Sequence, residues 1–307
     1  MQDTTVELEP LKRLTKDIKS AAATLSDDEA RYLVDTYYQM QDNRIRADGQ
    51  IRAMNAASEQ SEPHLTLDWL SANAATLERN IKSALDAYSD SHMVGRWSKG
   101  IVGIGPVLAA GLLANIDLMP WKCNGDKSTR KKADVCNSQL PCTPRCCFQQ
   151  IETVGHIWRF AGLDPTVSWQ KGQKRPWNAS LKTLQWKIGE SFVKVSGHKD
   201  DVYGHLYLER KQKEIARNDA GELAEQAVAK LAKFRIGKNT EAYKHYEAGR
   251  LPPSHIHARA KRWAVKIFLS HWHAVAYRDR FGVDAPKPYI LTQPHHTHDV
   301  RCPNWPF

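Results

Sequence analysis

The sequence lacks the features of a secreted or membrane-bound protein. No uninterrupted apolar stretch approaches the roughly 20 residues that a membrane-spanning helix requires. The first residues, MQDTTVELEPLKRL, contain no apolar signal core. Six cysteines in 307 residues are too few for a disulfide scaffold. We therefore expect a cytoplasmic protein that has no membrane partner.

The sequence is also poor in strand patterns. Residues 1–120 contain no convincing alternation of apolar and polar side chains. Neither a P-loop nor a dinucleotide-binding fingerprint is present, so chemistry driven by ATP or NAD is not expected. Apolar residues recur instead at helical spacings of three and four. The sequence predicts an all-α fold, or nearly so.

Two long helices are predicted in residues 1–94. Ser26 and Glu29 form a capping box, in which the serine hydroxyl accepts from the amide of Glu29 and the carboxylate reaches back to the amide of Ser26. An amphipathic helix follows, the polar stretch 58–63 interrupts it, and a second helix opens near Thr66. This antiparallel hairpin is either a coiled-coil arm that joins copies of the chain into a homo-oligomer or a plain layer of a helical bundle.

The segment from Gly103 to Pro106, with the sequence GIGP, predicts a helix-hairpin-helix. Gly103 and Gly105 are free to take positive φ, Pro106 suits the first turn of a new helix, and Ile104 would fill the gap between the two helices. Amides at such a turn donate to a phosphate of the DNA backbone. Lys99 precedes the turn and offers a cation to the same phosphate. The alternative is that the turn serves helix packing alone.

The charge balance favours a polyanionic partner. The chain carries 44 Lys and Arg against 34 Asp and Glu, a formal net charge of +10. In residues 169–194 cations are interleaved with indoles. Cations neutralise phosphates and indoles stack on bases, so DNA is the predicted partner and RNA a second candidate. We expect Trp186 to be buried and Trp169 and Trp177 to lie at the surface. The predicted DNA-binding cations of this segment are Lys171, Lys174, Arg175 and Lys182.

Three segments resemble, in this order, the C-terminal domain of bridge-RNA-guided insertion-sequence transposases: GIGPVLAAGLLANID, TVGHIWRFAGLDP and SWQKGQKRPWNASLKTLQWKIG. The resemblance covers residues 95–195 and implies a DNA-binding helix-hairpin-helix domain. It also implies a serine nucleophile soon after the GLDP turn, at Ser168. Such a hydroxyl attacks a phosphodiester when a base or a metal activates it, so Mg²⁺ is the candidate catalytic ion. The alternative for Ser168 is a helix cap or a hydrogen bond within a loop.

Members of that family also carry an N-terminal RuvC-like domain, in which four acidic residues lie on strands. In this chain Asp27, Asp28, Asp35 and Asp42 fall on a predicted helix instead. The nuclease-like half of the family pattern is therefore not seen, and the sequence leaves open whether the protein is an enzyme.

A basic insertion over residues 122–149 holds most of the cysteines. Thiolates gathered in a short polar loop are typical of a structural zinc site, for which Cys136, Cys142 and Cys146 are the candidate ligands. Free or redox-active thiols are the alternative. The C-terminal tail around His295 and His298 is a second candidate metal site.

The last part, residues 201–307, predicts three further helices. Amphipathic patterns cover 203–218 and 221–234, and a longer one covers 255–280 and stops at Gly282. The basic side of that longest helix, which could lie along DNA or RNA, holds Arg259, Lys261, Arg262 and Lys266. His271 and His273 face different ways on it, so we expect them to pack as aromatic rings rather than share a metal.

The sequence thus predicts a helical arm over 1–94, a helix-hairpin-helix domain over 95–200 and a helical region over 201–307. The first functional hypothesis is a transposase-like DNA-binding protein of a mobile element. The second is a non-catalytic nucleic-acid-binding accessory protein that dimerises through its arm and contains zinc. The third is a helical interaction protein in which the GIGP turn only packs helices together.

Overall fold

The computed structural model describes residues 9–57, 65–118, 121–122, 148–149, 151, 153–293 and 300–307. These residues are helical or irregular, apart from an antiparallel pair of two-residue strands, β1 (Trp121–Lys122) and β2 (Phe148–Gln149). The predicted all-α fold is confirmed. No helix in these ranges is both long and apolar enough to cross a membrane.

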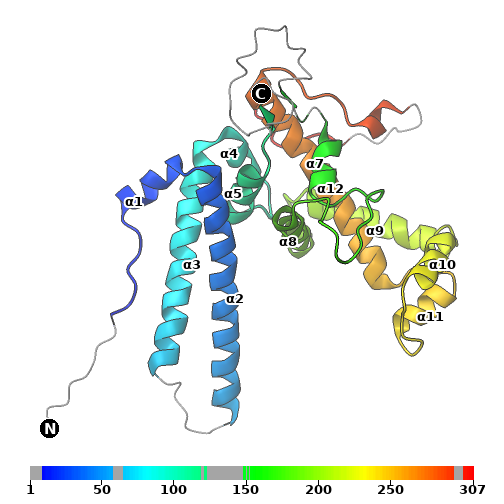
Figure 1. Ribbon diagram of the computed structural model, residues 1–307, viewed down its shortest axis with the longest axis horizontal. Helices are drawn as coiled ribbons and strands as arrows, with labels where there is room; N and C mark the ends of the chain where they lie inside the picture. Colours follow the sequence, from blue (N-terminus) through cyan, green and yellow to red (C-terminus); the bar gives the residue numbers. More distant parts are fainter. Residues whose placement is uncertain are drawn as a thin grey trace. The chain divides into compact units, whose positions relative to one another are not determined.

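Two compact units divide the chain, and Figure 1 shows their helices. The first unit comprises Met1–Lys99 and Gly105–Ile116, and the second comprises Gly100–Ile104 and Asp117–Phe307. The helical elements of the first unit are α1 (Lys16–Ala21), η1 (Ala22–Thr24), α2 (Asp27–Ala57), α3 (Leu65–Ser91), α4 (Met93–Lys99) and α5 (Pro106–Asn115). Those of the second are α7 (Val154–Phe160), α8 (Ala179–Val195), α9 (Tyr203–Asp219), α10 (Ala224–Lys233), α11 (Glu241–Glu247), α12 (Pro253–Phe281) and η2 (Tyr289–Thr292).

Helices α2 and α3 lie side by side as the predicted hairpin (Figure 1). Their hydrogen bonds show that they are antiparallel. At the start of α2, Asp27 accepts from the hydroxyl of Tyr88 near the end of α3, at 2.9 Å. Further along α2, Asp48 accepts from Ser71 near the start of α3, also at 2.9 Å. The antiparallel hairpin is therefore confirmed.

The start of α2 contains the predicted capping box. The amide of Ser26 donates to the carboxylate of Glu29 at 2.8 Å, and the amide of Glu29 donates to the hydroxyl of Ser26 at 3.3 Å. These bonds lower the pKa of Glu29 from its usual value, the bond from the Ser26 amide most of all. Asp28 and Asp35 lie on this helix, as the sequence predicts.

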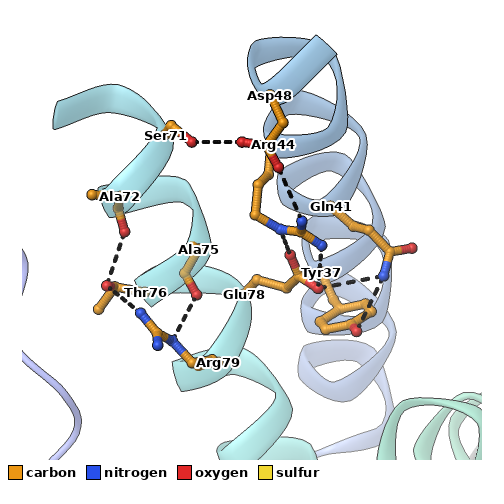
Figure 2. A network of polar contacts seen from close by, with 10 residues as sticks. All are labelled: Tyr37, Gln41, Arg44, Asp48, Ser71, Ala72, Ala75, Thr76, Glu78 and Arg79. Carbon is orange, nitrogen blue, oxygen red and sulfur yellow. Dashed lines mark hydrogen bonds and ion pairs between the residues drawn. The ribbon is translucent and has the colours of Figure 1, made fainter. Parts of the chain in front are cut away.

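The hairpin changes character along its length. Near α5 its interior is apolar, and Val34, Leu85 and Ala110 belong to one buried cluster. Further out, polar side chains connect the two helices, as Figure 2 shows: Arg44 donates to Glu78 at 2.7 Å and lies 3.3 Å from Asp48. Burial alone would raise the pKa of Glu78, but hydrogen bonds, foremost that from Arg44, outweigh it and lower the pKa. An apolar base and a polar outer part therefore hold the hairpin together.

In the second unit, α7, α8 and α9 pack against α12. Phe192, Tyr203 and Phe268 form a buried aromatic triangle with ring centroids 5.0 to 5.4 Å apart. His271 extends it, with Nδ1 2.7 Å from the Tyr203 hydroxyl and Nε2 2.8 Å from the carbonyl of Val300. Since a carbonyl only accepts, Nε2 carries a proton in this arrangement. The prediction that His271 packs as an aromatic ring is confirmed.

Candidate nucleic-acid interface

The GIGP turn starts a helix as its sequence predicts. Gly103 has φ +94°, and Pro106 occupies the first turn of α5. Gly105 is extended at φ −91° and ψ 176° and forms the N-cap of that helix. Ile104 is buried, and its amide donates to the carbonyl of Ile101 at 2.9 Å. Of the two glycines that were free to take positive φ, only Gly103 does so.

Gly103 is covered within the second unit. Ser191 of α8 donates to its carbonyl at 2.5 Å, and a Cβ at this position would lie 3.1 Å from the side chain of Val195. Gly105 is different, because it is exposed and a Cβ there would meet open space. Of the turn glycines, Gly105 is therefore the one that a phosphate could approach.

Lys99 is already engaged in the first unit. Its ammonium lies 2.5 Å from the carboxylate of Asp86 and 2.6 Å from that of Asp90. Burial would lower the pKa of Lys99, but these two carboxylates outweigh it and raise the pKa. A phosphate would have to displace two carboxylates to reach this cation, so Lys99 is the weakest of the predicted DNA contacts.

The GLDP turn positions side chains of the basic segment. Gly162 has φ +67°, and the amide of Leu163 donates to the carbonyl of Trp158 at 2.8 Å, which closes α7 in a Schellman turn. A Cβ at Gly162 would lie 2.9 Å from Lys182 and 3.1 Å from Trp177. Lys182 and Trp177 therefore pack directly on the turn, and only glycine leaves them room.

Residues 163–178 form an irregular loop around two indoles. Trp169 donates to the carbonyl of Gln173 at 2.7 Å, and its ring meets that of Trp177 edge to face, with centroids 6.5 Å apart. Each ring carries a cation. Nζ of Lys182 lies 3.7 Å from the centroid of Trp177, and the guanidinium of Arg175 lies 5.6 Å from that of Trp169. Trp169 is exposed, as predicted, and Trp177 is half-buried.

Arg175, Lys182 and Arg262 form a group that we call the cationic cluster. The pKa of Lys182 is lowered from its usual value, first by desolvation and then by the charges of Arg175 and Arg262. None of the three forms an ion pair with a carboxylate in the part of the chain that the structure describes. Cations that repel one another in this way create a positive potential that attracts a polyanion.

No family model, no curated protein and no solved structure matches this chain. Its function has to follow from its own residues.

Some basic residues of α12 pair with carboxylates, and others pair with none that the structure describes. Arg259 donates to the buried Glu214 at 2.7 Å, and Lys261 forms an ion pair with Glu190. Arg262, on the same helix, is exposed, and its charge contributes to the lowered pKa of Lys182. The sequence indicates a basic helix but does not show which of its cations are neutralised. Lys171 and Lys174 are exposed on the loop that leads to the cationic cluster.

Trp186 is 58% exposed, so the prediction that it is buried is wrong. The buried side of α8 includes Leu181, Gln185 and Ile188. Residue 185 lies four positions after 181 and three before 188, whereas residue 186 points about 100° further round the helix. Gln185 takes the core position, and the ring of Trp186 lies 5.3 Å from the ammonium of Lys261.

Ser168, the candidate nucleophile, is exposed in the loop between α7 and α8. Within the described ranges, no histidine or carboxylate is hydrogen-bonded to its hydroxyl. Asn178 caps α8 instead, by accepting from the amide of Leu181 at 3.0 Å. The structure therefore brings no activating base to Ser168 from these ranges.

The candidate zinc ligands Cys136, Cys142 and Cys146 lie outside the described residues, as do His295 and His298. Among the residues that are described, no three His, Cys, Asp or Glu side chains are grouped so that they could hold a metal ion. Zinc and Mg²⁺ remain expectations from the sequence.

Proposed function

We propose that the chain is a transposase-like DNA-binding protein whose second unit holds the DNA backbone on the cationic cluster. The observation that carries the proposal is the grouping of cations on exposed and half-buried indoles: Nζ of Lys182 lies 3.7 Å from the ring centroid of Trp177, and the guanidinium of Arg175 lies 5.6 Å from that of Trp169. The charges of Arg175 and Arg262 add to desolvation in lowering the pKa of Lys182. Placing like charges together costs free energy in the unbound protein, and phosphates that neutralise them offset that cost. Trp169, beside Arg175, offers an exposed indole for a base or a sugar.

Other cations of the second unit differ from the cationic cluster, because they pair with carboxylates. Arg217 pairs with Glu222 at 2.7 Å, and Lys244 pairs with Glu241 at 2.7 Å. An ordinary solvated surface mixes charges in this way. The cationic cluster instead places positive charge against indoles without a carboxylate partner from the described residues, which suits an external anion.

A salt titration of binding to duplex DNA tests the proposal. Each phosphate contact contributes about 0.9 to the slope of log affinity against log salt concentration. We expect the double variant Lys182→Ala/Arg262→Ala to bind more weakly and to lower the slope by about 2. The matched control Arg235→Ala/Lys238→Ala removes the same charges from exposed positions after α10 and should leave the slope unchanged. Equal slopes in the two variants would overturn the assignment.

The contribution of the GIGP turn has its own test at Gly105. Aspartate is a favoured N-cap, so Gly105→Asp should keep α5 folded while placing a negative charge where a phosphate would approach. Weaker DNA binding is expected. Thr15→Asp, at the exposed N-cap of α1, is the control. If both variants bind DNA like the parent protein, the turn serves packing only.

Two further elements belong to the proposal, one from the resemblance and one from the helical hairpin. The first is DNA strand transfer by Ser168, which a joining assay in Mg²⁺ tests: loss in Ser168→Ala with DNA affinity retained supports catalysis, whereas equal activity refutes it. The second is oligomerisation through the hairpin, on which Ile45, Leu70 and Leu77 are exposed. Light scattering that gives a monomer mass would refute it.

A further inference from the structure

A cavity of about 730 Å³ lies within the second unit. Its walls come from α7, α9, α12, the segment around η2 and the residues next to Val300. Sites for small ligands commonly have volumes of about 300–1,000 Å³. Trp158, Trp263, Ile267 and Leu291 line the cavity and make much of it apolar. The volume therefore suits an organic ligand.

The same cavity is lined by five cations and by no acidic residue among those described: Arg210, Lys213, Lys266, Lys287 and Arg301. Arg210 pairs with Glu214. The other four form no ion pair with any carboxylate that the structure describes. Burial lowers the pKa of Lys266, while Asp164 raises it and Arg262 lowers it. Grouped cations without a described carboxylate partner give this cavity a positive potential, which favours a ligand that carries negative charge.

The two indoles are held in place by the protein itself. Trp158 donates through Nε1 to the carbonyl of Lys266 at 3.2 Å, and Nζ of Lys266 lies 5.1 Å from the ring centroid of Trp158. The guanidinium of Arg210 lies 5.4 Å from the ring centroid of Trp263. Because the N–H of Trp158 is already bonded, this side chain can offer a ligand its ring but no hydrogen bond. Such a wall suits a flat aromatic group.

We propose that this cavity binds a 5′-nucleotide, with the base against the indoles and the phosphate on Lys213, Lys287 and Arg301. A nucleotide combines the two properties that the lining demands, a flat ring and a compact anion. It can be a free nucleotide or the 5′-phosphorylated end of a strand. The strand-end form rests on the proposed function, whereas the free form does not.

Calorimetric titration of the full chain with adenosine 5′-monophosphate tests the site. Adenosine lacks the phosphate and inorganic phosphate lacks the base, so each should bind at least about tenfold more weakly, the loss expected for one charge-assisted hydrogen bond or one stacking contact. Absence of saturable binding by the monophosphate would overturn the proposal. Equal binding by inorganic phosphate would also overturn it, because the indoles would then contribute nothing.

The double variant Lys213→Ala/Lys287→Ala keeps both tryptophans and removes two exposed cations from the lining. We expect the Kd for adenosine 5′-monophosphate to rise at least about tenfold. Lys199→Ala/Lys238→Ala removes the same charge from exposed positions outside the cavity and should leave the Kd unchanged. If the two double variants raise the Kd equally, the affinity depends on the overall charge of the protein rather than on this cavity, and the proposal is refuted.

Competition distinguishes the two sources of the nucleotide. The competitors are two short single strands, one with a 5′-phosphate and one with a 5′-hydroxyl. If only the phosphorylated strand displaces the monophosphate, the cavity binds strand ends. No displacement by either strand assigns it to free nucleotides. The Arg175→Ala/Lys182→Ala variant separates the two proposals, because neither residue lines the cavity: it should weaken duplex binding and leave the affinity for the free nucleotide intact.

Discussion

Glu214 gives the sharpest test of how the second unit is held together. Its side chain is fully buried on α9, where it accepts from Arg210 and, at 2.7 Å, from Arg259, and Arg217 lies 3.5 Å away. Burial alone would raise the pKa of this carboxyl, but the bond from Arg259 and the arginine charges outweigh it, so the pKa is lowered. Glu214→Gln keeps the volume of the side chain and removes its charge. We expect the substitution to destabilise the second unit strongly.

The magnitude follows from the charges that would be left behind. Breaking a buried ion pair by removing one partner costs about 3–5 kcal/mol. The arginine side chains keep 29%, 41% and 23% of their exposure, for Arg210, Arg217 and Arg259 respectively. Water can therefore solvate them in part, which reduces the expected loss to about 2–4 kcal/mol. For a unit of this size, that loss lowers Tm by roughly 5–15 °C.

Urea unfolding followed by tryptophan fluorescence measures this loss. The chain has ten tryptophans, of which Trp69 and Trp97 belong to the first unit, so eight report on the second. The matched control is Glu222→Gln, because Glu222 also pairs with an arginine but is 53% exposed, and it should cost no more than about 0.5 kcal/mol. The difference between Glu214→Gln and the parent should vanish as pH falls through the lowered pKa of Glu214. Similar losses in the two variants at neutral pH would refute the reasoning.

Three further substitutions test local features. Gly162→Ala forces a side chain into the left-handed region and against Lys182, so stability should fall by about 1–2 kcal/mol and DNA affinity should fall as well. The control Gly221→Ala, also at positive φ but in open space, should lower stability alone. Urea unfolding and the DNA titration measure the two effects. Gln185→Met removes a buried amide that has no partner among the described residues, and thermal unfolding should show a gain of about 1 kcal/mol; a loss would contradict this. Burial, above all, lowers the pKa of His255 to about 4. Protonation therefore favours the unfolded chain, and stability should decline by at most about 3 kcal/mol as pH falls from about 6.5 to 4. His255→Gln should remove that decline. If the pH profile of stability is the same in the variant as in the parent protein, His255 is not its cause.

The sequence predicts most of the helices, because their limits are encoded locally. The pattern over 203–218 corresponds to α9 at Tyr203–Asp219, and the pattern over 255–280 corresponds to α12 at Pro253–Phe281. Gly282 ends α12 with φ +73°, the conformation that glycine adopts without a steric cost. Capping residues, breaks and apolar spacing are properties of neighbouring residues, and a single sequence displays them directly.

The candidate site could be predicted only in part. Trp169 and the cations of residues 171–182 lie close together in the sequence, so their grouping is visible there. Arg262 follows Lys182 by eighty positions, and only the packing of α12 against α8 brings the two charges together. The pairing of Arg259 with Glu214 likewise depends on tertiary packing. The error at Trp186 has a simpler cause, since a shift of one position moves a helical side chain from the core to the solvent.

The change from an apolar base to a polar outer part along the α2–α3 hairpin has a dynamic consequence. Amides near Val34 and Leu85 are released to solvent only when a buried cluster opens, whereas those beyond Arg44 are held by contacts that water can replace. Hydrogen exchange should therefore be graded along the hairpin, slow at the base and progressively faster outward. A partner that binds the outer part of the hairpin should therefore slow the exchange of the outer amides and leave exchange at the base unchanged.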